Sequence, residues 1–342
     1  MEILELNLAN FRNFSSKKLI FDKNLTVVIG PNGSGKSNIL EAVGILCFQK
    51  PVRAQTDLDL VRFFKNEVKI EGIFTKDSEI KKLTINFEVR ENRVLKSFFS
   101  DSLRKRYFDF SQIASIVVFS PVDLDLVFGS PSLRRHHIDS LLSAADRDYW
   151  RNLSSYNKVV VRRNKVLTRI FEGKSKPAEL SFWDGRLVEH AVYISKVRRE
   201  LFDFLNFVEF GKNLSWVLKQ SVVFAQKLVE NRERDISAGV TLSGPHRDDF
   251  RFFEGERDLE YFGSRGQQRM SVLYLKLAEL EYLAKKKGWR PILALDDIFS
   301  ELDWEHRDAI LGIVGNHQTI ITAAEVESVP KMLLKKAKVV EL

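Results

Sequence analysis

Hydrophobic and polar positions follow two simple patterns near the start of the chain. Leucines occupy every second position over residues 3–8, which predicts a strand with one polar face. Residues 25–29 are almost entirely apolar, and such a short run predicts a strand buried on both sides, as in a parallel sheet. After a glycine-rich loop, apolar residues recur at i, i+4 and i+7 from Ile39, which predicts a helix.

Both patterns recur further along the chain. Alternation or short apolar runs predict strands at 68–74, 83–89, 116–119, 240–243, 250–253, 292–295 and 319–322. Helical spacing predicts a long helix over 268–287 and another over 305–314. Between about Leu133 and Arg234 the pattern differs, because glycine and proline are sparse and helical spacing dominates. We expect three or four helices there, with breaks near 173–177 and 211–213.

The order of these elements predicts an α/β fold with an inserted, mainly helical lobe. The expected division is a first part of lobe I at 1–125, lobe II at 126–288, and a second part of lobe I at 289–342. We find no internal repeat and no long heptad pattern.

Composition places the chain among folded proteins with a substantial core. Of its 342 residues, 44% are hydrophobic and 29% are charged, which disfavours a disordered or fibrous chain. No apolar run approaches the roughly 20 residues that a membrane helix needs, and no signal-peptide pattern opens the chain. We therefore expect a cytoplasmic protein. Cys47 is the single cysteine, so an internal disulfide is excluded, and its apolar surroundings predict a core position.

Charge indicates a polyanionic partner. The formal net charge is +8, and basic runs occur at 104–106, 134–135, 162–163 and 198–199. Phe98-Phe99 and Tyr107-Phe108 flank the first run, so stacking on bases is conceivable there. Ordinary charged surface remains the alternative for any single run. No base-reading motif is present, so we expect binding to the structure or backbone of DNA, without sequence specificity.

The glycine-rich loop carries the strongest chemical signal. It is a Walker A motif, which binds ATP, formed by Gly30, Pro31, Asn32, Gly33, Ser34, Gly35, Lys36 and Ser37. Its glycines let backbone N–H groups point at phosphate oxygens, and the following helix directs its positive end at the same place. We expect Lys36 to reach the β- and γ-phosphates and the Ser37 hydroxyl to bind Mg²⁺.

A P-loop also needs a distal carboxylate for the magnesium ion. The predicted strand at 292–295 delivers Asp296 at its C-terminal end, where open α/β sheets bind ligands. Asp297 follows at a position from which a general base could orient the attacking water. The expected catalytic group is therefore Lys36, Asp296 and Asp297.

A second candidate anion site opens the long helix. Ser264, Gly266 and Gln267 combine a hydroxyl, a glycine backbone and a helix N-terminus. Alone this signal is weak, because Ser-x-Gly also caps ordinary helices. It becomes informative together with the P-loop and the paired aspartates.

The combination resembles the P-loop head of ABC-type ATPases, a mixed sheet flanked by helices, with 300–303 similar to the family's D-loop. In detail it is similar to the RecF family of recombination mediators. The matching stretches are 10–14, 119–124, 129–135, 183–184, 243–249 and 263–269, and the resemblance runs to about residue 322.

The resemblance implies several properties. RecF-like proteins have two lobes without a long coiled coil, and they dimerise on ATP so that each signature loop closes over the partner's P-loop. They bind single-stranded and duplex DNA, work with RecR and RecO at gaps during recombination, replication and the SOS response, and hydrolyse ATP slowly as a release switch. By this likeness Ser264, Gly266 and Gln267 contact ATP held by the other subunit, and Arg12 lies near the phosphates of its own.

Two departures limit the resemblance. ABC heads usually place a histidine after the strand that follows the paired aspartates, but here His317 precedes that strand, and we do not assign it a catalytic role. Gln112 precedes the strand at 116–119, so no Q-loop glutamine is assigned. His136-His137 is expected to be a solvated helix face, and the role of His246 is left open between lobe packing and sensing of the ATP state.

Three other classes share part of this pattern. A transporter's nucleotide-binding subunit would show a Leu-Ser-Gly-Gly-Gln signature and a switch histidine. A condensin-like or Rad50-like protein would need hundreds of heptad residues between its motifs. The paired aspartates and the D-loop disfavour a metabolic P-loop kinase.

Overall fold

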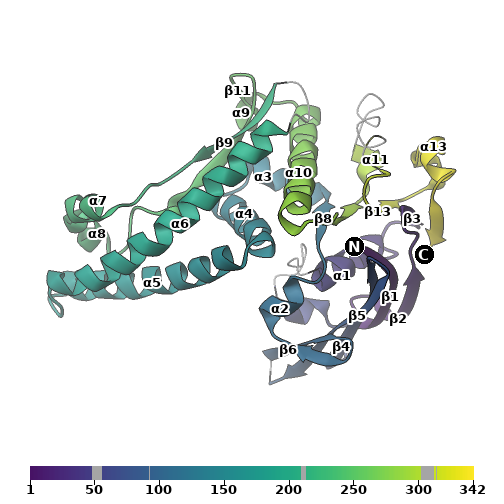
Figure 1. Ribbon diagram of the computed structural model, residues 1–342, viewed down its shortest axis with the longest axis horizontal. Coiled ribbons are helices and arrows are strands. Elements are labelled where there is room, and N and C mark those ends of the chain that lie inside the picture. Colours follow the sequence, from purple (N-terminus) through teal and green to yellow (C-terminus); the bar gives the residue numbers. More distant parts are fainter. Residues whose placement is uncertain (48–55, 92, 209–212, 302–311, 313) are drawn as a thin grey trace. The chain divides into compact units, whose positions relative to one another are not determined.

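The computed structural model describes residues 1–47, 56–91, 93–208, 213–301, 312 and 314–342 (Figure 1). The chain forms two compact units. Unit 1 consists of Met1–Leu124 and Arg269–Leu342, and unit 2 of Asp125–Gln268. In the part of the chain that the structure describes, no helix is both long and apolar enough to cross a bilayer.

A parallel sheet forms one layer of unit 1. Its strand order is β14-β3-β13-β12-β8. The strands are β3 (Leu25–Ile29), β8 (Ile116–Phe119), β12 (Ile292–Leu295), β13 (Thr319–Ala323) and β14 (Lys338–Glu341). All but β14 are buried along their whole length, which confirms the strands predicted from short apolar runs.

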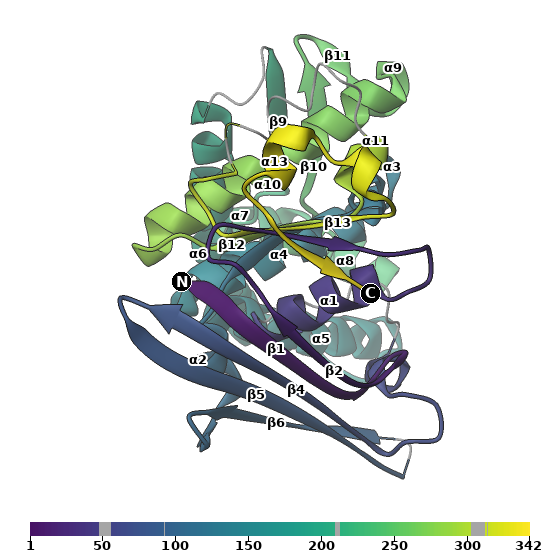
Figure 2. The same ribbon diagram turned by 90° about the vertical axis from the view of Figure 1, so that its right-hand side faces the viewer.

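A second, antiparallel sheet has the order β2-β1-β4-β5-β6-β7, and Figure 2 shows its long strands side by side. The strands are β1 (Glu2–Phe11), β2 (Phe14–Ile20), β4 (Glu67–Lys76), β5 (Glu79–Arg90), β6 (Arg93–Ser100) and β7 (Leu103–Lys105). The alternating burial of β4 confirms a strand with one wet face. Neither β2 nor β6 was predicted, because lysine and serine interrupt their apolar alternation.

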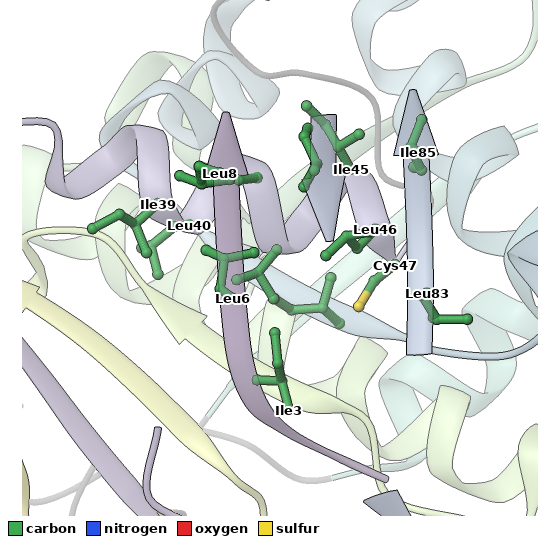
Figure 3. Close-up of a cluster of buried hydrophobic side chains, with 14 of the residues drawn as sticks. Ile3, Leu6, Leu8, Ile39, Leu40, Ile45, Leu46, Cys47, Leu83 and Ile85 are labelled. Carbon is green, nitrogen blue, oxygen red and sulfur yellow. The ribbon is translucent and has the colours of Figure 1, made fainter. Parts of the chain in front are cut away.

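The core of unit 1 gathers around helix α1 (Lys36–Leu46). Ile39, Val43 and Leu46 are fully buried, which confirms the helical spacing predicted after the glycine loop. Figure 3 shows apolar side chains of β1, α1 and β5 meeting in this cluster. Cys47 is buried here as expected, and burial raises the pKa of its thiol.

The remaining elements of unit 1 are short, except for one helix. They are η1 (Asp57–Leu60), α2 (Tyr107–Ser111), η2 (Pro121–Leu124), α11 (Ile298–Glu301), η5 (Val326–Ser328) and α13 (Lys331–Leu334). Helix α10 (Arg265–Lys287) begins three residues before its predicted start and is assigned to unit 1 from Arg269 onward. The predicted helix at 305–314 lies largely outside the described residues, and so do 302–303 of the D-loop.

The second unit boundary therefore differs from the expected one at 288/289. Most of α10 belongs with the α/β unit because buried polar contacts tie it there. Lys276 forms an ion pair with Asp123 at 2.9 Å, and Lys287 donates a hydrogen bond to Gln112. The sequence alone showed a helix but not which unit it packs in.

Unit 2 is mainly helical, as predicted. Its helices are α3 (Asp125–Phe128), α4 (Pro131–Ala145), α5 (Arg147–Phe171), η3 (Pro177–Glu179), α6 (Leu180–Phe207), α7 (Ala225–Glu230), α8 (Arg232–Ala238), η4 (Pro245–Arg247) and α9 (Leu259–Phe262). Long helices α5 and α6 pack along each other. The expected breaks separate α5 from α6 and α6 from the strand that follows it.

A small sheet of order β11-β10-β9 completes unit 2. Its strands are β9 (Leu214–Lys219), β10 (Asp249–Glu254) and β11 (Arg257–Asp258), and β10 confirms the prediction at 250–253. The strand predicted at 240–243 is wrong. There the Thr241 amide donates to the Asn164 side chain and the Leu242 amide to Asp235, so side chains replace the partners that a neighbouring strand would supply.

Candidate nucleotide-binding site

The glycine loop between β3 and α1 has the backbone shape of a phosphate cradle. Gly33 and Gly35 have φ angles of 86° and 106°, a region that favours glycine. A side-chain carbon on Gly35 would lie 2.6 Å from the Phe14 ring. The loop therefore keeps this shape only with glycine at position 35.

Polar groups inside the loop fit a bound phosphate. Lys36 Nζ, which is buried, donates to the carbonyls of Gly30 at 2.5 Å and Pro31 at 3.0 Å. The Ser34 hydroxyl oxygen is buried without a hydrogen-bond partner among the described residues. Helix α1 has no side-chain cap and no acidic residue in its first turn, so its first N–H groups remain for an anion.

A polar network joins the loop to the ends of two further strands. The Ser37 hydroxyl donates to Asp296 Oδ1 at 3.0 Å, and the Thr322 hydroxyl donates to the same oxygen at 2.8 Å. The Asp297 amide in turn donates to Thr322 Oγ1 at 2.9 Å. Asp296, Ser37 and Thr322 thus converge at the C-terminal edge of the parallel sheet.

Ser37 and Asp296 could hold Mg²⁺, because a hydroxyl and a carboxylate are hard oxygen ligands. No group of three or more His, Cys, Asp or Glu side chains suited to a metal occurs among the described residues. That finding agrees with a P-loop ion, most of whose ligands are nucleotide oxygens and water. Thr322 was not predicted, since a threonine in a buried strand carries no sequence signal of its own.

Asp297 has a left-handed backbone, with φ of 51°. This conformation is uncommon for a residue other than glycine and is typical of functional turns. The Ser300 hydroxyl donates to the Asp297 carbonyl at 2.8 Å and supports the turn. The chain therefore turns sharply directly after Asp296.

Arg12 does not donate to the glycine loop in this structure. Its guanidinium forms a two-pronged ion pair with Glu41 of α1, at 2.8 and 2.9 Å, and donates to the Asp59 carbonyl. The neighbouring Asn13 makes the loop contact by donating to the Ser34 carbonyl at 3.0 Å. Asn13 was missed as a site residue, although it lies in one of the family-like stretches.

The signature residues cap their own helix. The Gln267 amide donates to Ser264 Oγ at 3.2 Å, and the Ser264 amide donates to Gln267 Oε1 at 2.8 Å. This reciprocal pair is a capping box. Ser264 and Gly266 are exposed and belong to unit 2, whereas the glycine loop and both aspartates belong to unit 1.

The sequence suggested that both members of each basic pair lie at the surface, but in three pairs one arginine is buried. Arg134, Arg163 and Arg198 are 3%, 0% and 1% exposed, and each forms ion pairs with aspartates. Adjacent helical residues point about 100° apart, so one member of each pair enters the core. Within these basic runs, the other member of each pair is at least partly exposed, and Arg104 and Arg106 are exposed.

Two further residues have structural partners. His317 is buried, and its ring nitrogens contact the Pro291 carbonyl and Glu281. Gln112 donates to Ser111 and accepts from Lys287.

Comparisons with known proteins identify the family of this chain. A model of the RecF/RecN/SMC N-terminal domain family matches residues 2–341. A DNA replication and repair protein RecF from Moorella thermoacetica is 33% identical over 355 residues, covering 100% of this chain and 95% of the relative. The protein of the same name from Agathobacter rectalis is 34% identical over 351 residues, covering 99% and 96%.

Solved structures give the same picture. The recombination mediator protein RecF-ATPrS in the RecFOR pathway superposes with a TM-score of 0.85 at 29% identity, covering 96% of this chain and 94% of that one. An SMC head bound to the C-winged helix domain of ScpA shares the fold, with a TM-score of 0.52 at 18% identity, over 100% and 94% of the two chains. The predicted ABC-type head is thereby confirmed, and the chain belongs to the RecF/RecN/SMC family and, within it, to the RecF proteins.

Proposed function

We propose that this chain is an ATP-dependent DNA-binding protein of recombinational repair and replication maintenance. The observation that carries the proposal is the polar network of Lys36, Ser37 and Asp296 on a glycine loop with an uncapped helix behind it. The names of the full-length relatives support the repair role. ATP and Mg²⁺ are the proposed cofactors.

The site residues divide the work as follows. Lys36 exchanges its two loop carbonyls for phosphate oxygens, and loop N–H groups complete the cradle. Mg²⁺ bound by Ser37 and Asp296 would neutralise charge on the phosphates. Asp297, at the end of β12, orients the attacking water and accepts its proton. Slow hydrolysis then serves as a release switch.

The exposed signature end is the proposed contact between two subunits. Ser264, Gly266 and Gln267 are expected to meet ATP held by a second copy, so that ATP closes a dimer on DNA. Gapped and single-strand/duplex DNA is the proposed substrate, with RecR-like and RecO-like proteins as partners in the cytoplasm.

DNA binding with and without ATP, on duplex, single-stranded and gapped substrates, tests this proposal. Affinity should rise with ATP and fall steeply with salt, because phosphate contacts release counterions. Reversing the charges of 104–106 should weaken binding to all sequences alike, because Arg104 in β7 and Arg106 directly after it are exposed. The salt slope should flatten by about one for each lost phosphate contact. Equal DNA affinity with and without ATP would contradict the proposal.

A further inference from the structure

Unit 2 contains a cavity that the proposed ATP site does not use. It has a volume of about 200 Å³ and lies between α4, α5, α6 and η4. Its floor includes the buried Tyr156 and Arg198, and exposed residues stand at its rim. The lining residues are Ser132, Arg135, His136, Asp139, Leu153, Tyr156, Asn157, Arg198, Pro245 and His246.

Two consecutive arginines of α4 behave differently beside this cavity. Arg134 is 3% exposed and forms a two-pronged ion pair with Asp249, at 2.6 and 2.9 Å. Arg135 is half-buried, and within the described part of the chain it makes one hydrogen bond, to the Asp248 carbonyl at 2.8 Å, and no ion pair. Burial, followed by the charge of Arg198, lowers the pKa of Arg135. Arg135 therefore brings a charge without an ion-pair partner in the described chain, and spare N–H donors, to the cavity wall.

The nearby carboxylates are already engaged. Arg198 Nη1 donates to Asp248 at 2.7 Å and its Nη2 to Asp139 at 2.7 Å. Arg198 also donates to the Tyr149 hydroxyl and the Pro245 carbonyl, so the floor is held by its own hydrogen bonds. Asp139 and Asp248 are thus paired with Arg198, and neither forms an ion pair with Arg135.

The other polar groups suit an anion with several oxygens. Ser132 and Asn157 stand at the rim with hydroxyl and amide donors, and His136 stands beside them. On the floor, Tyr156 pairs with His246 Nδ1 at 2.7 Å, and His246 Nε2 donates to the Thr241 carbonyl at 2.9 Å. Guanidinium, hydroxyl and amide donors around one opening can serve the several oxygens of a phosphate group.

We propose that this cavity binds a phosphate group of a DNA strand, with the Arg135 guanidinium as its main ligand and Ser132, His136 and Asn157 around it. The inference rests on the proposed DNA binding and adds a contact point on unit 2. A free phosphate ion has the same chemistry, and an acidic side chain of a protein partner is the other class of occupant. The experiment separates these three.

The test compares Arg135→Gln with Arg186→Gln in the full-length chain with ATP. Arg186 is the matched control because it is an exposed helical arginine of the same unit, paired with Glu189. Arg135→Gln should weaken binding to duplex and single-stranded DNA about tenfold and reduce the salt slope by about one. Arg186→Gln should leave both unchanged. Arg135→Lys should keep the salt slope of DNA binding but not the full affinity, because lysine lacks the paired N–H donors of the planar guanidinium.

Calorimetric titration with inorganic phosphate distinguishes a DNA phosphate from a free phosphate ion. It is carried out on the Arg135 and Arg135→Gln chains, both of which also carry Lys36→Met. If the heat of phosphate binding depends on Arg135 but the affinity for DNA does not, the cavity binds the free ion and the proposal is overturned. Parental DNA affinity and salt slope in Arg135→Gln would overturn it as well, leaving a partner's acidic side chain as the occupant.

If Arg135→Gln does not fold, His136→Gln at the exposed rim should still weaken DNA binding, and parental DNA affinity in that variant counts against the site. Absence of DNA binding by the parent chain would instead contradict the proposed function.

Discussion

The helices α1 and α10 both begin with a glycine, a serine and an N-terminus that suits an anion, yet their first turns differ. At α1 no side chain caps the helix, and the nearby Ser34 hydroxyl is buried without a partner among the described residues. At α10, Ser264 and Gln267 satisfy each other's amides in a capping box. The first end is organised for a ligand before any ligand arrives, and the second is satisfied without one.

This difference indicates different costs of binding. A phosphate at α1 meets donors already in place, with only the Lys36 contacts to exchange. A phosphate at α10 must replace the Ser264 cap, so that end should contribute only when ATP is already held elsewhere. The comparison favours a P-loop that binds ATP alone and a signature end that closes afterward.

Lys36→Met should have the largest effect, because it removes the positive charge from the prepared end. ATP hydrolysis should fall by about 1000-fold, and ATP-dependent DNA binding should disappear. Steady-state hydrolysis and fluorescent-nucleotide titration measure both. Hydrolysis at the parental rate would show that α1 is not the nucleotide site.

Asp297→Asn should slow hydrolysis by about 100-fold while leaving ATP binding intact, since an amide is a poor base. Asparagine also tolerates the left-handed backbone at this position, so the fold should survive. The variant should accumulate as an ATP-bound dimer in light scattering. A fully active variant, or one that stays monomeric with ATP, would remove Asp297 from the water-orienting role.

Ser264→Arg should distinguish the two helix ends, because it should affect dimer formation and leave ATP binding at α1 intact. A long cation at the exposed signature position should weaken the ATP-dependent dimer by at least about tenfold, by bulk and by like charge across a two-fold interface. ATP affinity of each monomer should remain within about twofold of the parent, because α1 is untouched. Molar mass with and without ATP, alongside nucleotide titration, measures both quantities. Normal dimerisation would reject the two-subunit site, and loss of ATP binding would mean that Ser264 serves its own subunit.

The smallest expected effect is on thermal stability, in a matched pair of serine-to-alanine variants measured without nucleotide. Ser264→Ala loses a cap and should destabilise the protein by about 1 kcal/mol. Ser34→Ala should be neutral, because its hydroxyl makes no hydrogen bond among the described residues. Thermal melts should differ by about 2 °C. Equal melting temperatures would show that the two ends are equally satisfied, and the comparison would fail.

The sequence was most informative where the chemistry lies in consecutive residues. The glycine loop and the paired aspartates after β12 are each contained in a few neighbouring positions, so their residues could be named from the local sequence. The signature turn is as short, but it became informative only together with those two motifs. The buried strands of the parallel sheet were predicted for the same reason. Where side chains took over backbone hydrogen bonds, as at Thr241, the apolar pattern misled.

The sequence by itself therefore determined the head architecture and the main residues of the candidate nucleotide site. Only the tertiary structure decided that Thr322 links Asp296 to Asp297, that Asn13 supports the glycine loop, and that Arg135 rather than Arg134 faces a cavity. These contacts join segments far apart in the chain. Which residues meet in such contacts depends on how strands and helices pack, and a local pattern of residues does not predict that packing.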